Sequence, residues 1–214
     1  QGQKIKVKTL LNNMIVYSDN TATDLLIKKV GAKKVNKLIK VFVQDGFGPI
    51  TTLVDVRKRA YGHLHPALSA LDRQTFIEVR KTRGYQERVQ KLSNAASIAL
   101  KDFHLKSWAA AFERYYQEGV NSSTLESLGK FYEKLYRGQI LNSFYTQYLF
   151  DLMKVIKTGK RRIKAGLGSD IVFYHKTGTQ YSRLCDSGIA VKGNKAWVVV
   201  SCAQKFGYLR KAEK

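Results

Sequence analysis

The hydrophobic pattern of this chain changes once, near residue 165. Before that point apolar residues recur at helical spacing, as in residues 7–14. After it come three β-branched and aromatic runs separated by turn residues: 170–179, 183–193 and 195–204. The sequence therefore predicts an α+β fold, with a mostly helical lobe over residues 1–165 and antiparallel strands over residues 166–214.

The N-terminal part of the chain has the pattern of three short helices separated by turn residues. Asn20 or Thr21 can cap the second helix, and Gly31 ends it. The third helix closes at Gly46. Residues 50–90 show neither the helical nor the strand period clearly, so the sequence predicts an irregular insertion there.

The chain is strongly basic, with 38 Lys and Arg against 16 Asp and Glu and a formal net charge of +22. Such a surface attracts anionic partners. A nucleic-acid partner is not expected, because no nucleic-acid reading motif accompanies the basic clusters. A basic polyanion-binding module stays open as an alternative of another class, and salt-dependent retention on DNA would support it.

The sequence does not favour a membrane-spanning or a metal-binding protein. No apolar run approaches the ~20 residues that a membrane span needs. Cys185 and Cys202 fit either one disulfide or two buried thiols, and they lack metal-site spacing. His63 and His65 have no clear third ligand and are interpreted as loop histidines. We therefore expect neither a metal nor another cofactor.

Two short polar motifs carry the functional signal: Ser-Asp-Asn at 18–20 and Lys-Thr-Gly at 176–178. Each alone could be a local structure, a helix cap for the first and a strand-end turn for the second. Together, and in this order, they resemble the second and third signatures of the serine β-lactamases and penicillin-binding proteins. The chain around them is similar to class A β-lactamases over about residues 3–50 and 120–203.

The resemblance implies a role for each residue of the first motif. Ser18 is the hydroxyl that relays a proton to the leaving nitrogen, hydrogen-bonded to Lys176. Asn20 holds the side-chain amide of the substrate and helps to orient the general-base lysine of the family. Asp19 ties the loop down and does not touch the substrate.

The second motif is implied to bind the substrate. Lys176 and Thr177 bind the substrate carboxylate, and Gly178 belongs to the same substrate-binding stretch. The backbone N–H of Thr179 forms one arm of the oxyanion hole. Arg183 is a further candidate for carboxylate binding, although its spacing from the motif does not fix that role.

The nucleophile motif of the family, Ser-x-x-Lys upstream of Ser-Asp-Asn, has no counterpart in the 17 residues before Ser18. The one Ser-x-x-Lys in the chain runs from Ser127 to Lys130. It falls in a helix that a capping box of Ser123 and Glu126 predicts, and we interpret it as an ordinary helix position. We therefore expect a missing N-terminal segment or a partner chain to carry the nucleophile, and this chain alone to be inactive.

The deacylating base of the family also has no counterpart. In class A enzymes it is a Glu in a Glu-x-x-Leu-Asn motif that follows Ser-Asp-Asn, and residues 50–90 contain no such motif. Glu78 and Asp72 are candidates by residue type only. Without a placed base the acyl-enzyme would be long-lived, as in a penicillin-binding protein.

The resemblance therefore predicts a β-lactamase/transpeptidase-like α+β fold, incomplete at both termini. Its intact form would be a serine β-lactamase-like hydrolase that acylates on serine and hydrolyses the β-lactam amide bond. A D-alanyl-D-alanine peptidase, or an inactive homologue that binds β-lactams or peptidoglycan, stays open as an alternative. The expected partner is a β-lactam or peptidoglycan-like small molecule, and the family is periplasmic or secreted.

Overall fold

The computed structural model describes residues 3–105, 107–206 and 213, and the chain divides into two compact units. One unit combines residues 1–50 with 121–214, and the other comprises residues 51–120. This division differs from the lobes predicted over 1–165 and 166–214. The predicted lobes divide the chain by secondary-structure type, whereas the two units are defined by their internal contacts, so the lobes stay a prediction.

The first unit contains a three-stranded antiparallel sheet in the order β1-β2-β3. Its strands are β1 (Val172–Gln180), β2 (Arg183–Lys192) and β3 (Lys195–Gln204). Two-residue turns join them, and a positive φ at Ser182 (49°) and at Gly193 (56°) suits such tight hairpins. The predicted antiparallel meander is confirmed, and β1 lies at one edge of it.

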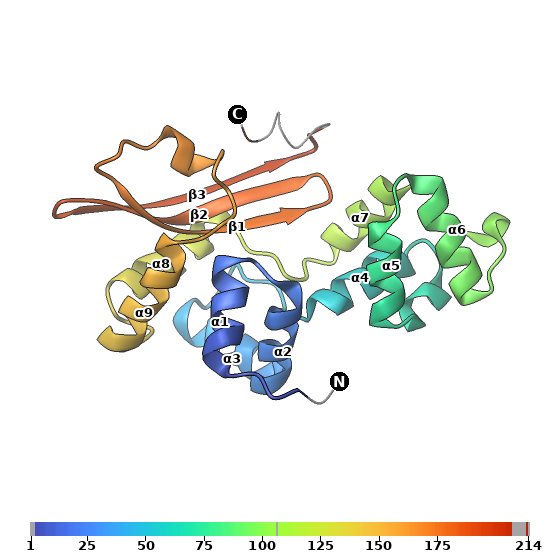
Figure 1. The fold of residues 1–214 in the computed structure, drawn as a ribbon, viewed down its shortest axis with the longest axis horizontal. Helices are drawn as coiled ribbons and strands as arrows, with labels where there is room; N and C mark the ends of the chain where they lie inside the picture. Colours follow the sequence, from blue (N-terminus) through green and yellow to red (C-terminus); the bar gives the residue numbers. More distant parts are fainter. Residues whose placement is uncertain (1–2, 106, 207–212, 214) are drawn as a thin grey trace. The chain divides into compact units, whose positions relative to one another are not determined.

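Helices α8 (Leu125–Tyr136) and α9 (Ser143–Lys154) cover one face of the sheet (Figure 1). Side chains from both helices and from β2 form a buried cluster there: Tyr132, Leu135, Phe150, Met153 and Ile189. This core holds the sheet against the helices, so the strand that carries Lys-Thr-Gly is fixed relative to them.

The N-terminal residues of the same unit form α1 (Val7–Val16), α2 (Asn20–Val30) and α3 (Ala32–Phe42). Helices α1 and α2 pack on each other through Leu10, Ala22 and Leu26. The backbone N–H of Lys157, just after α9, donates to the carbonyl of Val16 at 2.9 Å. The corner between α1 and α2 is therefore attached to the rest of the unit.

The second unit is helical and has its own core, although the sequence predicts an irregular insertion over much of it. Its elements are α4 (Leu53–Gly62), η1 (Pro66–Ala70), α5 (Arg73–Lys81), α6 (Tyr85–Ala96), η2 (Leu100–Asp102) and α7 (Trp108–Gln117). Aromatic residues gather at the centre of this core, as in the Tyr61–Trp108 and Tyr61–Phe76 ring contacts. The helices are short, and their aromatic and β-branched residues obscure the helical period.

None of the helices in the described parts of the chain has the length and apolar character of a membrane-crossing segment.

Candidate active site

The structure brings the two sequence motifs into direct contact. The Nζ of Lys176, on β1, donates a hydrogen bond to the Oγ of Ser18 at 2.8 Å and another to the carbonyl oxygen of Thr177 at 2.9 Å. Ser18 lies in the corner between α1 and α2, far away in sequence. The hydroxyl and the amine therefore form one polar centre between the helices and the edge of the sheet.

The backbone of the corner holds Ser18 in an uncommon conformation. Its φ is +56°, in the left-handed region that a residue with a side chain rarely adopts. The N–H of the next residue, Asp19, donates to the carbonyl of Asn13 at 3.0 Å. The corner is thus tied to α1, and its strain is compensated by contacts in the folded chain.

Asp19, and not Asn20 or Thr21, is the N-cap of α2. One of its carboxylate oxygens accepts from the N–H groups of Thr21 at 2.6 Å and Ala22 at 3.0 Å. Asn20 is the first residue of the helix and lies next to this cap. The carboxylate therefore stabilises the helix start that positions Ser18.

Thr177 and Thr179 project from β1 to the side opposite Lys176, as alternation along a strand requires. The Oγ1 of Thr177 lies 2.6 Å from the Oγ1 of Thr158. The Oγ1 of Thr179 accepts from the guanidinium of Arg162 at 2.7 Å. A ligand carboxylate that binds the Thr177 hydroxyl would therefore replace the hydrogen bond between Thr177 and Thr158.

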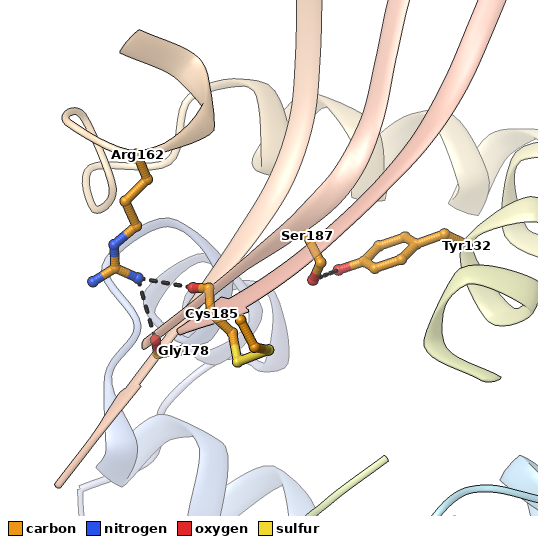
Figure 2. Close-up of a disulfide and its surroundings, with 6 residues drawn as sticks. Tyr132, Arg162, Gly178, Cys185 and Ser187 are labelled. Carbon is orange, nitrogen blue, oxygen red and sulfur yellow. Dashed lines mark hydrogen bonds between the residues drawn. A yellow bond between two sulfur atoms is a disulfide. The ribbon is translucent and has the colours of Figure 1, made fainter. Parts of the chain in front are cut away.

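Arg162 is the principal residue of this region that sequence reasoning missed. Its guanidinium also donates to the carbonyl oxygens of Gly178 at 3.2 Å and Cys185 at 2.9 Å (Figure 2). Its side chain is 8% exposed and pairs with Glu213 at 3.3 Å. Only the dense run of basic residues at 160–164 marked this segment in the sequence. The guanidinium of Arg162 lies beside the second motif. The sequence had suggested a different arginine, Arg183, as a candidate for carboxylate binding there.

Burial changes the acid–base character of Lys176. Removal from water and, to a smaller extent, the nearby charge of Arg162 lower the pKa of its amine from the ordinary 10.5 to about 8. The carboxylate of Asp186 acts in the opposite direction. An amine with a pKa near 8 can give up and regain a proton at physiological pH.

Asp186 also belongs to a buried pair behind the second motif. Its Oδ1 lies 2.7 Å from the Nδ1 of His175, whose side chain is 0% exposed and stacks on Phe173. Asp186 lines a cavity of about 530 Å³ together with Arg162 and Ser201. The pair therefore fixes the middle of β1 against β2 on the face that also carries Thr177.

The two cysteines form a disulfide between facing residues of β2 and β3, Cys185 and Cys202 (Figure 2). The hydroxyls of Tyr132 and Ser187 lie 3.3 Å apart and join α8 to β2; the same figure draws this hydrogen bond. The sequence left a disulfide and two thiols open. The structure decides for the disulfide.

The Ser-x-x-Lys of this chain lies within helix α8. Ser127 is buried and accepts from the hydroxyl of the N-cap Thr124 at 2.9 Å, while Lys130 pairs with Glu126 at 2.6 Å. Thr124 caps the helix, one residue later than the predicted Ser123. These contacts are those of an ordinary helix start.

The remaining candidates of the sequence lie in the second unit and have local structural partners. Asp72 caps α5 through the N–H of Thr75, and Glu78 pairs with Lys81 at 3.0 Å. The Nε2 of His63 lies 2.7 Å from a carboxylate oxygen of Glu118, and the Nδ1 of His65 accepts from the N–H of Ala67. Within the described residues no group of three potential metal ligands occurs.

Comparison with known proteins shows the family of the chain. A family model described as the beta-lactamase enzyme family matches residues 1–44 and 75–213. The chain belongs to this family. A comparison of the sequence with curated proteins finds no match.

Solved structures share the fold of this beta-lactamase family chain. The TLA-1 extended-spectrum beta-lactamase is 18% identical with a TM-score of 0.62, over 98% of this chain and 60% of that one. A beta-lactamase from Chitinophaga pinensis is 17% identical with a TM-score of 0.62, over 100% and 62%. The protein named PBP-A is 18% identical with a TM-score of 0.59, over 99% and 57%. The chain thus spans about three fifths of the length of these structures.

Proposed function

We propose that this chain supplies the substrate-binding and proton-relay part of a serine β-lactamase-like hydrolase. The observation that carries the proposal is the 2.8 Å hydrogen bond from Lys176 to Ser18, made by two motifs that lie far apart in sequence. By resemblance, the substrate is a β-lactam whose carboxylate is bound by Lys176 and Thr177. The protein would act in the periplasm or outside the cell.

The chemistry follows from the proton positions. When the amide bond of the substrate breaks, its nitrogen needs a proton, and the hydroxyl of Ser18 can give one. Lys176, with a pKa of about 8, returns a proton to Ser18 through the existing hydrogen bond. Lys176 ends neutral, Ser18 ends as a hydroxyl, and the leaving nitrogen ends as an amine.

The remaining roles are proposed from the positions of the residues. Asn20, at the start of α2 beside Ser18, would hold the side-chain amide of the substrate. Because β1 is an edge strand of the described sheet, alternate backbone groups of β1 face away from β2. The N–H of Thr179 would use this edge as an oxyanion donor, and the buried charge of Arg162 would strengthen carboxylate binding.

The attacking serine is assigned to a Ser-x-x-Lys motif outside this sequence, on a longer form of the chain or on a partner. The hydroxyl of Ser18 is hydrogen-bonded to the amine of Lys176, which would return its proton, and this arrangement suits a proton relay. Ser127 is buried within a helix start. Neither hydroxyl is therefore proposed to attack.

A D-alanyl-D-alanine peptidase, or a homologue that binds without turnover, is the second candidate. The observation that favours it concerns deacylation: Asp72 and Glu78 have local structural partners, and residues 50–90 contain no Glu-x-x-Leu-Asn. Turnover of a D-alanyl-D-alanine peptide, with a stable penicillin adduct, would identify this alternative in the longer form.

Ligand-induced stabilisation tests the binding site. A penicillin should raise the melting temperature of the chain, and Lys176→Ala should abolish that rise because it deletes a charge-assisted hydrogen bond worth ~1.5 to 3 kcal/mol. Lys154→Ala, an exposed lysine at the end of α9, is the matched control and should keep the rise. An equal rise in the Lys176 variant would contradict the assignment of this site.

Mass spectrometry tests the assignment of the nucleophile. The 214-residue chain incubated with a reactive penicillin should carry no covalent adduct. A form extended through a Ser-x-x-Lys helix should be acylated at that serine, and replacement of either motif residue should prevent it. A penicilloyl group on Ser18 or Ser127 of the short chain would overturn the proposed division of roles.

A further inference from the structure

Helices α2 and α3 carry a dense group of lysines on their outer side, which we call the lysine face. No acidic residue lies between Asp24 and Asp45. The lysine face comprises the six lysines of this interval: Lys28, Lys29, Lys33, Lys34, Lys37 and Lys40. All six are exposed. Such a density of one sign produces a locally positive potential.

This positive charge is not neutralised within the described chain. The salt bridges found among the described residues involve none of the lysines of the lysine face. Asp24, the acid nearest to the lysine face on its N-terminal side, is itself buried. The lysines are therefore available to an external anion.

Aliphatic side chains lie among these lysines. Val41 is 67% exposed and Leu38 is 43% exposed. Val41 follows Lys37 by four residues and Leu38 follows Lys34 by four, so each aliphatic side chain neighbours a lysine on the helix surface. The exposed side of α3 is thus a mixed surface of ammonium groups and branched hydrocarbon.

The opposite side of α3 is fixed to its own unit. The side-chain amide of Asn36 donates to the carbonyl of Ile50 at 2.9 Å and accepts from the N–H of Ile50 at 2.6 Å. Asn36 lies roughly opposite Leu38 and Val41 around the helix. These hydrogen bonds fix the rotation of α3 about its axis, so the lysine face stays on the outer side of the helix.

We propose that the lysine face binds an anionic lipid surface and holds the protein peripherally on it. A helix with lysines and exposed aliphatic residues suits the headgroup boundary, where ammonium groups meet lipid phosphates and aliphatic side chains reach the upper acyl region. The methylene stems of the lysines lie along the apolar layer while their charges stay in water. A soluble polyanion would bind the ammonium groups of the lysines but would make no comparable contact with Leu38 and Val41.

Vesicle flotation tests the proposal with the full chain. The protein should float with vesicles that contain phosphatidylglycerol and stay behind with pure phosphatidylcholine, and added salt should weaken the binding. The fourfold variant carries Lys33→Gln, Lys34→Gln, Lys37→Gln and Lys40→Gln. Its partitioning should fall at least about a hundredfold, because each lysine near an anionic leaflet contributes about fivefold.

A matched control separates the lysine face from net charge. Four exposed lysines elsewhere, replaced by Gln, give the same change in charge: Lys91, Lys101, Lys154 and Lys195. This control should lose less than about fivefold. Both variants should keep the melting temperature of the parent chain, because none of the eight side chains is buried. Equal losses in the two variants would overturn the proposal.

Substitution of the exposed aliphatic side chains, Leu38 and Val41, distinguishes lipid binding from binding of a soluble polyanion. Leu38→Ser with Val41→Ser should lower partitioning into phosphatidylglycerol vesicles about tenfold or more, while leaving retention on duplex DNA unchanged. Val41→Cys labelled with a polarity-sensitive fluorophore should shift its emission to the blue on vesicles. Unchanged partitioning of the serine variant, without a spectral shift, would identify the lysine face as a site for soluble polyanions and contradict the lipid proposal.

Discussion

The amine of Lys176 and the hydroxyl of Ser18 lie 2.8 Å apart although 158 positions separate them in the chain. This contact joins the strand β1 to the corner between α1 and α2. The corner is held by the cap of Asp19 and the strand by its pairing with β2. The position of the hydroxyl relative to the amine therefore depends on the fold of the whole unit, and each supporting contact can be tested separately.

Replacement of Ser18 should distinguish its hydroxyl from its backbone conformation. Ser18→Ala removes one acceptor of a largely buried amine and should lower the free energy of unfolding by about 1 to 3 kcal/mol. Ser18→Gly removes the same hydroxyl but relieves the positive φ of +56°, so it should be about 1 kcal/mol more stable than the alanine variant. Urea denaturation measures both, with the exposed Ser123→Ala as control. Equal stability of the two variants would contradict the strain at this corner.

The depressed pKa of Lys176 predicts the sign of a pH effect on stability. Below pH about 8 the amine is charged in both the folded and the unfolded chain, and folding bears the full cost of burying the charge. Between about 8 and 10.5 the unfolded chain binds more protons, so the free energy of unfolding contributed by Lys176 rises with pH. The total gain is at most about 3 kcal/mol.

Comparison with Lys176→Met isolates this contribution from the other titrating groups. Relative to that variant, the parent chain should gain stability as the pH rises from 7 toward 10. Parallel urea titrations at each pH give the difference directly. A difference that stays constant would show that the amine keeps its ordinary pKa in the folded chain, and a difference that falls with pH would show a raised pKa; either result would contradict the prediction.

The sequence predicts the polar centre better than it predicts the helices around it. Ser-Asp-Asn and Lys-Thr-Gly are short signatures whose resemblance to those of the family implied that Ser18 and Lys176 meet, and the strands β1 to β3 are β-branched and aromatic runs with turn residues between them. In contrast, residues 50–90 form helices whose caps and aromatic core become evident only in three dimensions. The helical period is weak there because the elements are short.

Arg162 shows why the rest of the site could not be predicted. It stands in a run of basic residues, and nothing local distinguishes it from Arg161 or Lys164. Its position is decided by carbonyl groups on two different strands, those of Gly178 and Cys185. Contacts of this kind have no periodicity or spacing in the sequence, so only the folded chain reveals them.

The disulfide between Cys185 and Cys202 should stabilise the hairpin next to the site. It closes a loop over a sequence separation of 17, for which restriction of the unfolded chain predicts about 3 kcal/mol. Cys185→Ser with Cys202→Ser should therefore lower the urea midpoint, and a dithiol reductant should lower the midpoint of the parent to about the same value. The reductant should not affect the double variant. A reduced parent as stable as the oxidised one would contradict this prediction.

Arg162 allows the effect of its charge to be separated from that of its hydrogen bonds. Arg162→Lys keeps a positive charge but loses the planar fork that reaches Gly178 and Cys185, so it should lower the free energy of unfolding by about 1 to 3 kcal/mol. Arg162→Gln removes the charge as well. Because that charge lowers the pKa of Lys176, the glutamine variant should raise this pKa above about 8, whereas the lysine variant should not.

The pKa of Lys176 in both variants can be read from the stability difference against Lys176→Met in the same background. For Arg162→Gln the rise of stability with pH should begin at a higher pH than in the parent chain and should be smaller in total, since the folded pKa then lies closer to 10.5. Desolvation remains the larger cause, so the ordinary value should not be fully restored. If the lysine and glutamine variants shift the onset equally, the influence of Arg162 on Lys176 acts through the hydrogen-bonded position of β1 and not through its charge.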